Sequence, residues 1–417
     1  MKRNILILTI AALMFSCSNR QSEIFEWKGP GRTGVYNETN LLKEWPEDGP
    51  AELWSIDGIG NGYGSPVIAE KHLFVTGEID SMAVLWCFDL KGTKVWQTTL
   101  GREWMRSYPG GRDAPTVVGD LVYIGTGLGD LYCVERSNGE IRWVRRLNED
   151  FNGVLPLHGY TEAPLVDGDR VFWTPGGKEN NVVALNRFTG DLIWSNAGFG
   201  EPQGYNQPKL ISLPSRNILV TFSSYHLMGF DTGTGELLWN HEQDNLTPEE
   251  RKPGYGDTHS NTVLFEDGHI WYVAGDGNGA VKLKLSDDGT SITEIWRNKN
   301  LNGYMGGIVK LGDFIYGDVQ RPPGLRSISA ITGELIDSLR NGDGAVIASD
   351  GMLYYYTTRG VVHLIEPDNG KLKEISSFRI TRGTKEHFMH PVINRGVLYI
   401  RRGNSLMAFD IRNQTKV

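Results

Sequence analysis

Residues 182–194, VVALNRFTGDLIW, form the unit from which this chain is built. An apolar, β-branched run is followed by a polar turn that contains Gly190, and then by a short run that ends in Trp194. This pattern predicts a strand, a tight turn and a second strand. Variants of the unit occur at 88–96, 134–143, 230–239 and 285–296, with weaker copies at 329–339 and 365–375. We expect a repeat this frequent to be the building block of the fold.

Two more strand signals precede each copy of the unit. In the copy that ends at Trp143, apolar runs at 113–118, 121–125, 131–134 and 141–143 are separated by tight turns. The same pattern of four strands begins near Ser65, Asp113, Glu162, Asn206, Ser260, Gly306, Ala345 and His390. Four short strands repeated every 40 to 60 residues or so are typical of one blade of a β-propeller.

The two ends of the repeat array predict how the ring closes. The eighth copy, residues 391–410, stops after its third strand, and residues 52–55 form an isolated strand before the first complete copy. Pairing these two pieces removes an open sheet edge. We therefore predict an all-β fold over residues 45–417: an eight-bladed β-propeller of four-stranded antiparallel blades, with the last blade closed by an N-terminal strand.

Residues 1–16 have the layout of a signal peptide. Lys2 and Arg3 precede an apolar core that is too short to span a bilayer. Cys17 follows at once, as in bacterial lipoproteins, and is the predicted lipidation site; the alternative is an ordinary signal peptide before an unmodified cysteine. In both cases the mature chain leaves the cytoplasm. With the lipid, it would be held in the cell envelope, at the outer membrane or on its periplasmic side.

Residues 17–44 are expected to form a lipid-anchored tether followed by a segment that packs on the ring. The segment is polar and then rich in Gly and Pro, but it also contains Trp27 and Tyr36. Such aromatic side chains would be poorly placed in a disordered tail. The chain is therefore predicted to be ordered before the first blade begins.

The charge of the chain excludes several kinds of partner. The net charge is −8, and removal of residues 1–16 takes away only Lys2 and Arg3, which lowers it to −10. An acidic protein is a poor ligand for nucleic acids or anionic membranes, so any membrane attachment is expected through the lipid alone. A closed ring has no free edge to pair, which favours a monomer. Cys87 and Cys133 occupy the same position in neighbouring repeats and are predicted to be free, structural thiols.

The repeat resembles that of the pyrroloquinoline quinone-type propellers. Residues 184–194, ALNRFTGDLIW, and 229–239, GFDTGTGELLW, closely match its pattern of Ala-x-Asp, turn, Thr-Gly and Trp. Residues 27–54 and 61–68 resemble the exported, quinoprotein-like lipoproteins grouped with BamB, the outer-membrane assembly propeller. The resemblance extends over about residues 45–410 and is specific for architecture, whereas a shared fold does not fix an activity.

The resemblance implies two different functions. Cofactor-free propellers such as BamB act as scaffolds, whereas quinoprotein alcohol dehydrogenases bind the quinone with calcium and carry a pair of adjacent cysteines. This chain has no Cys-Cys pair. The preferred interpretation is therefore a non-catalytic binding or scaffolding module without a cofactor, whose partner is another envelope protein. The alternative is an alcohol or sugar dehydrogenase that uses pyrroloquinoline quinone and calcium.

The candidate binding site is the axial mouth of the ring. The connections that lead into the innermost strands, here called the mouth loops, converge on the axis, so residues distant in sequence become neighbours there. The candidate pocket residues on this face are Tyr63, Arg112, Asp113, His158, Glu162, Lys178, Asn206, Asp257, His259, Tyr304 and His390. Their aromatic and amide groups suggest a small molecule or a glycan as ligand, which makes a carbohydrate-binding propeller a third hypothesis.

Two other interpretations compete at this mouth. Polar loop residues in repeat proteins often bond backbone groups at the junctions between blades. His158, His259 and His390 lack the local spacing of a zinc site, so no metal site is assigned. No catalytic residue is assigned either.

A protein partner would need exposed apolar side chains on the longer loops. The candidates for this patch are Trp104, Met105, Tyr108 and Phe151.

Overall fold

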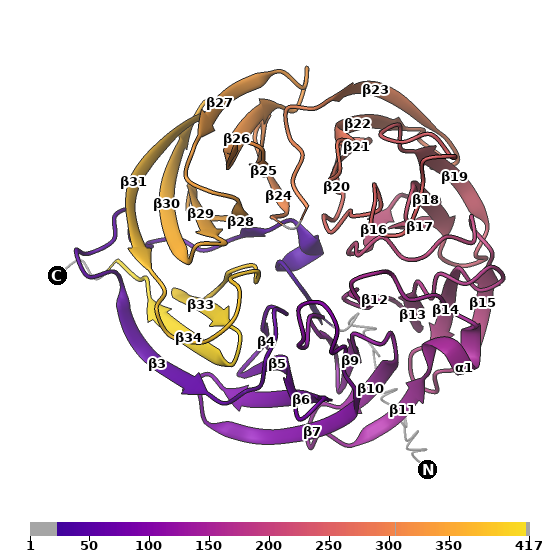
Figure 1. The fold of residues 1–417 in the computed structure, drawn as a ribbon, viewed down its shortest axis with the longest axis horizontal. Helices are drawn as coiled ribbons and strands as arrows, with labels where there is room; N and C mark the ends of the chain where they lie inside the picture. Colours follow the sequence, from indigo (N-terminus) through magenta and orange to yellow (C-terminus); the bar gives the residue numbers. More distant parts are fainter. Residues whose placement is uncertain (1–22, 305, 414–417) are drawn as a thin grey trace, which may run out of the picture.

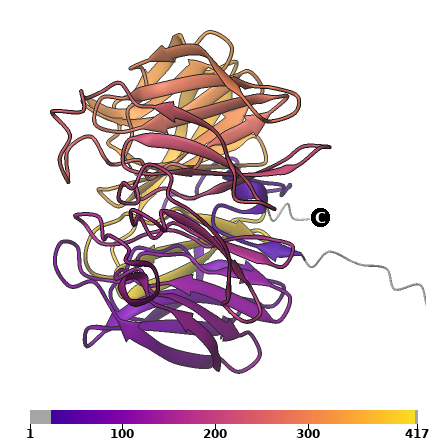
Figure 2. The same ribbon diagram turned by 90° about the vertical axis from the view of Figure 1, so that its right-hand side faces the viewer.

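The computed structural model describes residues 23–304 and 306–413. Within these ranges the chain forms eight antiparallel blades around a central axis, and each blade has four strands (Figure 1). The predicted eight-bladed propeller is confirmed. Figure 2 shows the ring from the side, with the connecting loops gathered at its two faces. The predicted signal peptide and the predicted lipidation site, Cys17, lie outside the described residues.

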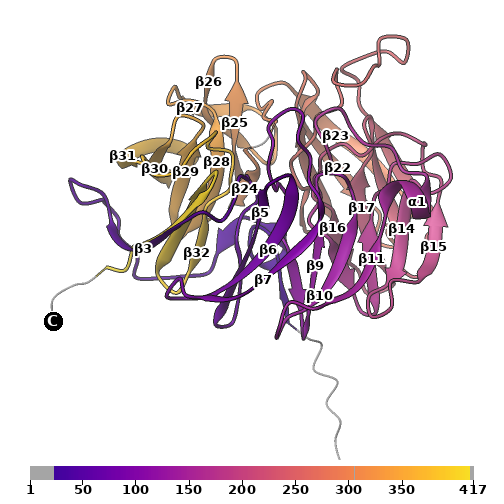
Figure 3. The ribbon, with the colours of Figure 1, turned by 60° about the horizontal axis from the view of Figure 1, so that its bottom comes forward.

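The first four blades follow one another directly along the sequence. In each blade the innermost strand comes first and the chain then runs outward (Figure 1). Figure 3 shows the first and second blades side by side. Their strands are β4 (Val67–Ala69), β5 (His72–Ile79), β6 (Met82–Asp89) and β7 (Lys94–Arg102); β8 (Thr116–Val118), β9 (Leu121–Gly125), β10 (Leu131–Glu135) and β11 (Ile141–Arg145); β12 (Leu165–Asp167), β13 (Arg170–Trp173), β14 (Val182–Asn186) and β15 (Leu192–Asn196); and β16 (Lys209–Ser212), β17 (Asn217–Phe222), β18 (His226–Asp231) and β19 (Leu237–Glu242).

The last four blades complete the ring, and the N-terminal strand closes it. The strands are β20 (Leu264–Glu266), β21 (His269–Ala274), β22 (Gly279–Leu285) and β23 (Ile292–Asn298); β24 (Ile308–Leu311), β25 (Phe314–Gln320), β26 (Pro323–Ser329) and β27 (Leu335–Leu339); β28 (Gly344–Ser349), β29 (Met352–Thr357), β30 (Val361–Asp368) and β31 (Lys371–Arg379); and β32 (Val392–Asn394), β33 (Val397–Arg402), β34 (Ser405–Asp410) and β3 (Ala51–Asp57). β3 pairs antiparallel with β34, which confirms the predicted seam.

The tryptophan of the repeat joins each blade to the next one. Trp143 on β11 is buried, and its indole Nε1 donates a hydrogen bond to the carbonyl of Arg187 in the following blade at 3.0 Å. A Cβ on Gly190 would lie only 2.9 Å from the Trp143 ring, so this turn requires glycine. The indoles of four other tryptophans, 54, 96, 194 and 296, donate in the same way to a carbonyl of the next blade at 2.9–3.0 Å. The Gly and the Trp of the sequence pattern therefore meet between neighbouring blades.

The segment before the first blade enters the centre of the ring. It comprises β1 (Ile24–Phe25), the 3-10 turn η1 (Pro30–Arg32) and β2 (Val35–Tyr36), and residues 24–36 are here called the axial plug. β1 is antiparallel to β8 and so runs toward the mouth loops, whereas β2 is parallel to β28 and runs away from them. The axial plug thus enters and leaves by the face opposite the mouth, with its turn at the centre of the ring (Figure 1).

Buried cations hold the axial plug in the ring. Arg32 pairs with Glu26 at 2.7 Å and donates to the carbonyls that lead into β12 and β16 at 2.8–3.0 Å. Lys28 donates to the carbonyl of Ile308, the first residue of β24, at 3.0 Å. Burial, assisted by Lys209, lowers the pKa of Lys28 to about 7. Because these bonds reach three different blades, the plug ties the inside of the ring together.

Two cysteines and one short helix are the remaining features of the described part of the chain. Cys87 and Cys133 are buried free thiols in separate apolar clusters, and burial raises the pKa of each to about 12. The single α-helix among the described residues, α1 (Leu147–Phe151), has five residues and lies between the second and third blades. Nowhere in residues 23–304 or 306–413 does a helix have the length and hydrophobicity needed to cross a bilayer.

Candidate functional site: an axial pocket at the mouth of the ring

A pocket of about 460 Å³ opens on the axis at the mouth loops. Trp27 of the axial plug closes its base; Asp276 reaches it from the connection between β21 and β22, and Gln320 from the end of the second strand β25. The remaining wall residues come from the mouth loops of seven blades: Tyr63, Gly64, Ser65, Tyr108, Arg112, Ala114, His158, Thr161, Tyr205, Gln207, Gly254, Thr258, Ser260, Tyr304, Phe388 and His390. Small-molecule sites of proteins are concave and of roughly 300–1,000 Å³, so this pocket has the size of one.

One side of the pocket is a continuous row of aromatic rings. Tyr108 contacts Phe388 and His158, with ring centroids 5.7 and 6.4 Å apart. Phe388 contacts Tyr63 at 5.5 Å, and His158 contacts Tyr205 at 6.2 Å. These five rings are here called the aromatic arc. Hydrogen bonds fix its two ends, since the Tyr63 hydroxyl donates to Glu386 at 2.8 Å and the Tyr205 hydroxyl accepts from the His158 amide at 3.0 Å.

Arg112 supports the middle of this arc. Its guanidinium donates to the carbonyls of His158, of Ser107 at 3.1 Å and of Tyr108 at 2.5 Å. Burial lowers the pKa of Arg112, while Glu103 and Asp113 oppose this shift. Because both terminal nitrogens bond loop carbonyls, Arg112 positions Tyr108 and His158.

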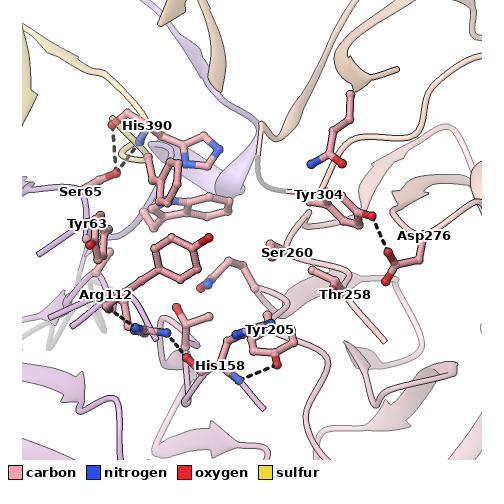
Figure 4. Close-up of a pocket in the computed structure, with 18 of the residues that line it drawn as sticks. Tyr63, Ser65, Arg112, His158, Tyr205, Thr258, Ser260, Asp276, Tyr304 and His390 are labelled. Atoms are coloured by element: carbon pink, nitrogen blue, oxygen red, sulfur yellow. Dashed lines mark hydrogen bonds between the residues drawn. The ribbon is translucent and has the colours of Figure 1, made fainter. Parts of the chain in front are cut away.

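The other side of the pocket is polar. It consists of Thr258, Ser260, Asp276, Tyr304 and Gln320, here called the polar wall. The Tyr304 hydroxyl donates to Asp276 at 2.5 Å, and burial together with this bond raises the pKa of Tyr304 to about 12. No partner among the described residues occupies the side-chain oxygens of Thr258 and Ser260 or the amide of Gln320. Figure 4 shows Thr258, Ser260 and Tyr304 across the opening from Tyr63, Arg112 and His158.

The structure separates the eleven predicted pocket residues into three groups. Five line the pocket: Tyr63, Arg112, His158, Tyr304 and His390. Five others are buried beside it: Asp113, Glu162, Asn206, Asp257 and His259. Lys178 is exposed and does not belong to the pocket wall. The sequence periodicity thus indicated which loops gather at the pocket side of the ring. It did not indicate which of their side chains line the pocket and which are buried beside it.

Three members of the buried group, Asp113, Glu162 and His259, make contacts across blade junctions. A carboxylate oxygen of Asp113 accepts from the Glu162 amide of the next blade at 2.9 Å. His259 contacts the Ser224 carbonyl at 2.7 Å and Gln243 at 2.5 Å, and burial lowers its pKa to about 4. Burial also raises the pKa of Glu162 to about 8 and that of Asp113 well above its usual value. The sequence analysis gave such bonds between blades as the alternative to a binding role for these residues.

Several wall residues were not predicted from the sequence. Phe388 lies in the same mouth loop as the predicted His390, but a single phenylalanine in a loop gives no sign of a binding role in the sequence. Asp276 comes from a second-to-third-strand connection and Gln320 from the end of a second strand, and both reach the same face. Trp27 could not be placed from sequence, because only the tertiary structure brings the axial plug under the pocket. Of the four residues suggested for a partner patch, Trp104 and Phe151 are buried, whereas Met105 and Tyr108 are exposed.

The pocket does not fit a quinone–calcium pair. Calcium binds six to eight oxygen ligands, usually including several carboxylates. The pocket wall contains one carboxylate, Asp276, which already accepts a hydrogen bond from Tyr304. Within the described parts of the chain, no three His, Cys, Asp or Glu side chains are grouped so that they could hold a metal ion.

Comparison with family models assigns the chain to a family. Residues 81–336, more than half of the chain, match the model described as outer membrane protein assembly factor BamB. The chain belongs to the BamB family. Comparison with curated protein sequences gives no match.

Solved structures with the same fold include a BamB and proteins that are not described as BamB. BamB from Moraxella catarrhalis is 14% identical, with a TM-score of 0.63, covering 87% of this chain and 99% of its own. A quinohemoprotein alcohol dehydrogenase from Comamonas testosteroni is 11% identical, with a TM-score of 0.51 and coverages of 93% and 80%. The computationally designed Ika8 protein is 12% identical, with a TM-score of 0.55 and coverages of 86% and 99%. At these identities the likeness extends to the fold only.

Proposed function

We propose that this protein is an exported, lipid-anchored and non-catalytic binding module that takes part in outer-membrane protein assembly, as a monomer that holds another envelope protein. The observation that carries this proposal is its membership of the BamB family. The acidic composition of the chain makes nucleic acids and anionic lipid surfaces poor alternative partners.

Exposed apolar side chains around the pocket mouth supply a surface for such a partner. Met105, Tyr108, Val154, Leu157 and Tyr255 are 42–51% exposed and all lie in mouth loops. They are here called the mouth patch. Tyr108 also belongs to the pocket, and Leu157 lies against Gly254 of the pocket wall, so the patch continues into the pocket. Exposed aromatic and aliphatic groups gathered at one place are typical of protein interaction sites.

The position of the axial plug gives the proposed anchor a direction. Five residues separate Cys17 from Glu23, so the two could lie at most about 20 Å apart. The described chain enters the ring by the face opposite the mouth. An anchor on Cys17 would therefore hold the mouth patch facing away from the membrane, where an envelope protein can reach it.

A genetic complementation experiment tests the partner role. Deletion of the gene in the native host is expected to lower the amount of folded outer-membrane proteins, and the wild-type gene should restore it. The Met105→Asp/Leu157→Asp variant should fail to do so, because charge in the mouth patch opposes apolar contact. The Ile331→Asp variant, at an exposed apolar position on an outer turn, is the matched control. Equal complementation by both variants would reject the mouth patch as the partner surface.

A labelling experiment tests the anchor. Growth with an alkyne-bearing fatty acid should label the wild-type protein and place it in the membrane fraction, while Cys17→Ser should be unlabelled and soluble in the periplasm. Labelling of the Cys17→Ser variant would reject Cys17 as the lipidation site.

A calorimetric titration separates the scaffold from the quinoprotein-like oxidoreductase. Pyrroloquinoline quinone with calcium is added to the protein without its signal peptide, and to the His158→Ala/His259→Ala variant. We expect no binding, because the pocket offers few ligands to calcium. Tight binding that the double variant abolishes would replace the scaffold proposal by the oxidoreductase.

A further inference from the structure

We propose that the axial pocket is a saccharide-binding site that takes a mono- or disaccharide. This inference goes beyond the role in assembly and rests on the aromatic arc and the polar wall inside the pocket, which share only Tyr108 with the exposed mouth patch. The observation behind it is that the two sides of the pocket differ in chemistry, with rings on one side and hydroxyl and amide groups on the other.

The aromatic arc provides the surface for the apolar face of a sugar. A pyranose ring carries C–H groups on its faces and hydroxyl groups around its edge, so it packs flat against aromatic rings through dispersion. Tyr108 lies in the middle of the arc and is about half exposed, with its neighbours Phe388 and His158 on either side. Arg112 fixes the backbone on which Tyr108 and His158 stand. The arc is therefore formed before a ligand arrives, which reduces the entropic cost of binding.

The polar wall provides partners for the hydroxyl groups of the sugar. The side chains of Thr258, Ser260 and Gln320 line the pocket and have no partner among the described residues. They offer both donors and acceptors, as a sugar hydroxyl requires. A ligand without hydroxyl groups would leave these groups unpaired on desolvation, which costs affinity. The wall thus selects for a ligand that is polar along one edge.

The charges of the pocket favour a neutral ligand. The terminal nitrogens of Arg112 donate to loop carbonyls, so its guanidinium is not available for a bidentate grip on a carboxylate or phosphate. Asp276 adds a carboxylate on the opposite side, where it accepts from Tyr304. Among the described residues of the pocket wall, Arg112 is the only lysine or arginine; Arg321, which acts electrostatically on Tyr304, lies outside the wall. An anionic ligand, including the carboxylate end of a peptide, would therefore meet Asp276 with no other lysine or arginine of the wall to balance it. A neutral sugar avoids this conflict.

The shape of the pocket limits the length of the saccharide. The axial plug blocks the axis, and Trp27 forms the base of the pocket beside His390, with their ring centroids 4.9 Å apart. A polysaccharide therefore cannot pass through the ring. The pocket of about 460 Å³ instead accepts a free sugar or the end of a glycan chain.

Titration calorimetry and saturation-transfer NMR with four probes test the proposal: maltose, cellobiose, lactose and di-N-acetylchitobiose. At least one should bind with a millimolar or lower dissociation constant. Tyr108→Ala should weaken its binding about tenfold, because the central ring of the arc is lost. Tyr108→Phe, which keeps the ring, should stay within about threefold. Ile331→Ala, at an exposed apolar position on an outer turn away from the pocket wall and the mouth patch, is the control and should bind as the wild type does.

Other results would overturn the proposal. These are the absence of binding by all four sugars at about 10 mM, binding that Tyr108→Ala leaves unchanged, or displacement of the bound sugar by short acidic peptides. Because Tyr108 is half exposed, its variants should fold. Phe388→Ala removes a different ring of the arc and serves as a second test variant. The role in assembly can fail or succeed independently, since it is tested through Met105 and Leu157.

Discussion

At the scale of the residue, the glycine of the repeat is required by its neighbour in the preceding blade. Gly190 has a φ of +76°, and a Cβ there would lie 2.9 Å from the Trp143 ring. Gly351 has a similar φ of +74°, but nothing lies within 4 Å of its Cβ position. The two glycines therefore separate the cost of the backbone conformation from the cost of the contact.

Alanine at these two positions should destabilise the fold to different extents. Gly351→Ala should lower the free energy of unfolding by about 1–2 kcal/mol, the cost of a left-handed backbone for an L-residue. Gly190→Ala should cost the same plus about 1–3 kcal/mol, because the Trp143 ring must move. Urea denaturation measures both values. Equal losses would show that the Trp143 contact does not constrain Gly190.

Glu162 should make stability depend on pH. Burial raises its folded-state pKa to about 8, from a usual value of 4.5. Between these values the folded protein keeps a proton that the unfolded chain has lost, so stability falls as pH rises through this window. Glu162→Gln stays neutral. Its free energy of unfolding relative to the wild type should therefore rise by at least about 1 kcal/mol between about pH 5 and pH 8.

Paired urea denaturation curves at the two pH values measure this difference. Glu149 is on the surface, with its side chain 77% exposed, so Glu149→Gln serves as the control and should leave the pH dependence unchanged. A difference between Glu162→Gln and the wild type that does not vary with pH would show that Glu162 is ionised in the folded protein.

At the scale of the element, the axial plug depends on Arg32. This fully buried side chain pairs with Glu26 and donates to three carbonyls in front of β12 and β16. Arg32→Ala would remove this donor from the carbonyls of Ala163 and Pro208 and the buried cation from Glu26, although the Gly31 amide still donates to Glu26. We expect the free energy of unfolding to fall by about 3–5 kcal/mol, as for other broken buried ion pairs.

The matched change is Arg142→Ala, which removes an exposed pair with Glu135. It should cost at most about 1 kcal/mol. Denaturation curves compare the two variants, and hydrogen exchange should show lost protection in β1 and β2 for Arg32→Ala. If Arg32→Ala cost no more than Arg142→Ala, the plug would not contribute to holding the ring.

At the scale of the whole molecule, the seam between β3 and β34 keeps the ring closed. Trp54 on β3 packs against Gly92 and donates to the carbonyl of Leu90 at 2.9 Å, so the last blade docks on the first through the contact used elsewhere in the ring. Trp54→Ala should lower the free energy of unfolding by about 2–4 kcal/mol, because Trp54 is only partly buried.

Hydrogen exchange distinguishes the seam from the other junctions. In Trp54→Ala, the amides of β3 and β34 should exchange first, because this pairing joins distant parts of the chain. Trp194→Ala removes the corresponding contact inside the ring and should leave β3 protected. Early exchange of β3 in both variants would mean that the ring opens as one unit, with no weaker seam.

The sequence by itself determined the repeat, the number of blades and the closing strand. These depend on local strand and turn signals and on the spacing of the tryptophans, all of which can be recognised in the amino-acid sequence. The same periodicity placed the mouth loops on one face. It could not say that Tyr63 and His158 line the pocket while Glu162 and His259 are buried at blade junctions, because side-chain depth depends on packing between blades.

Only the tertiary structure decided what fills the axis. The axial plug has no repeat pattern, and its position follows from pairing with β8 and β28 and from the bonds of Lys28 and Arg32 to distant carbonyls. The same holds for the two-sided pocket, since Phe388 meets Tyr108 across some 280 residues of chain. Contacts between residues so far apart leave no local signal in a single sequence, because they exist only once the ring has closed.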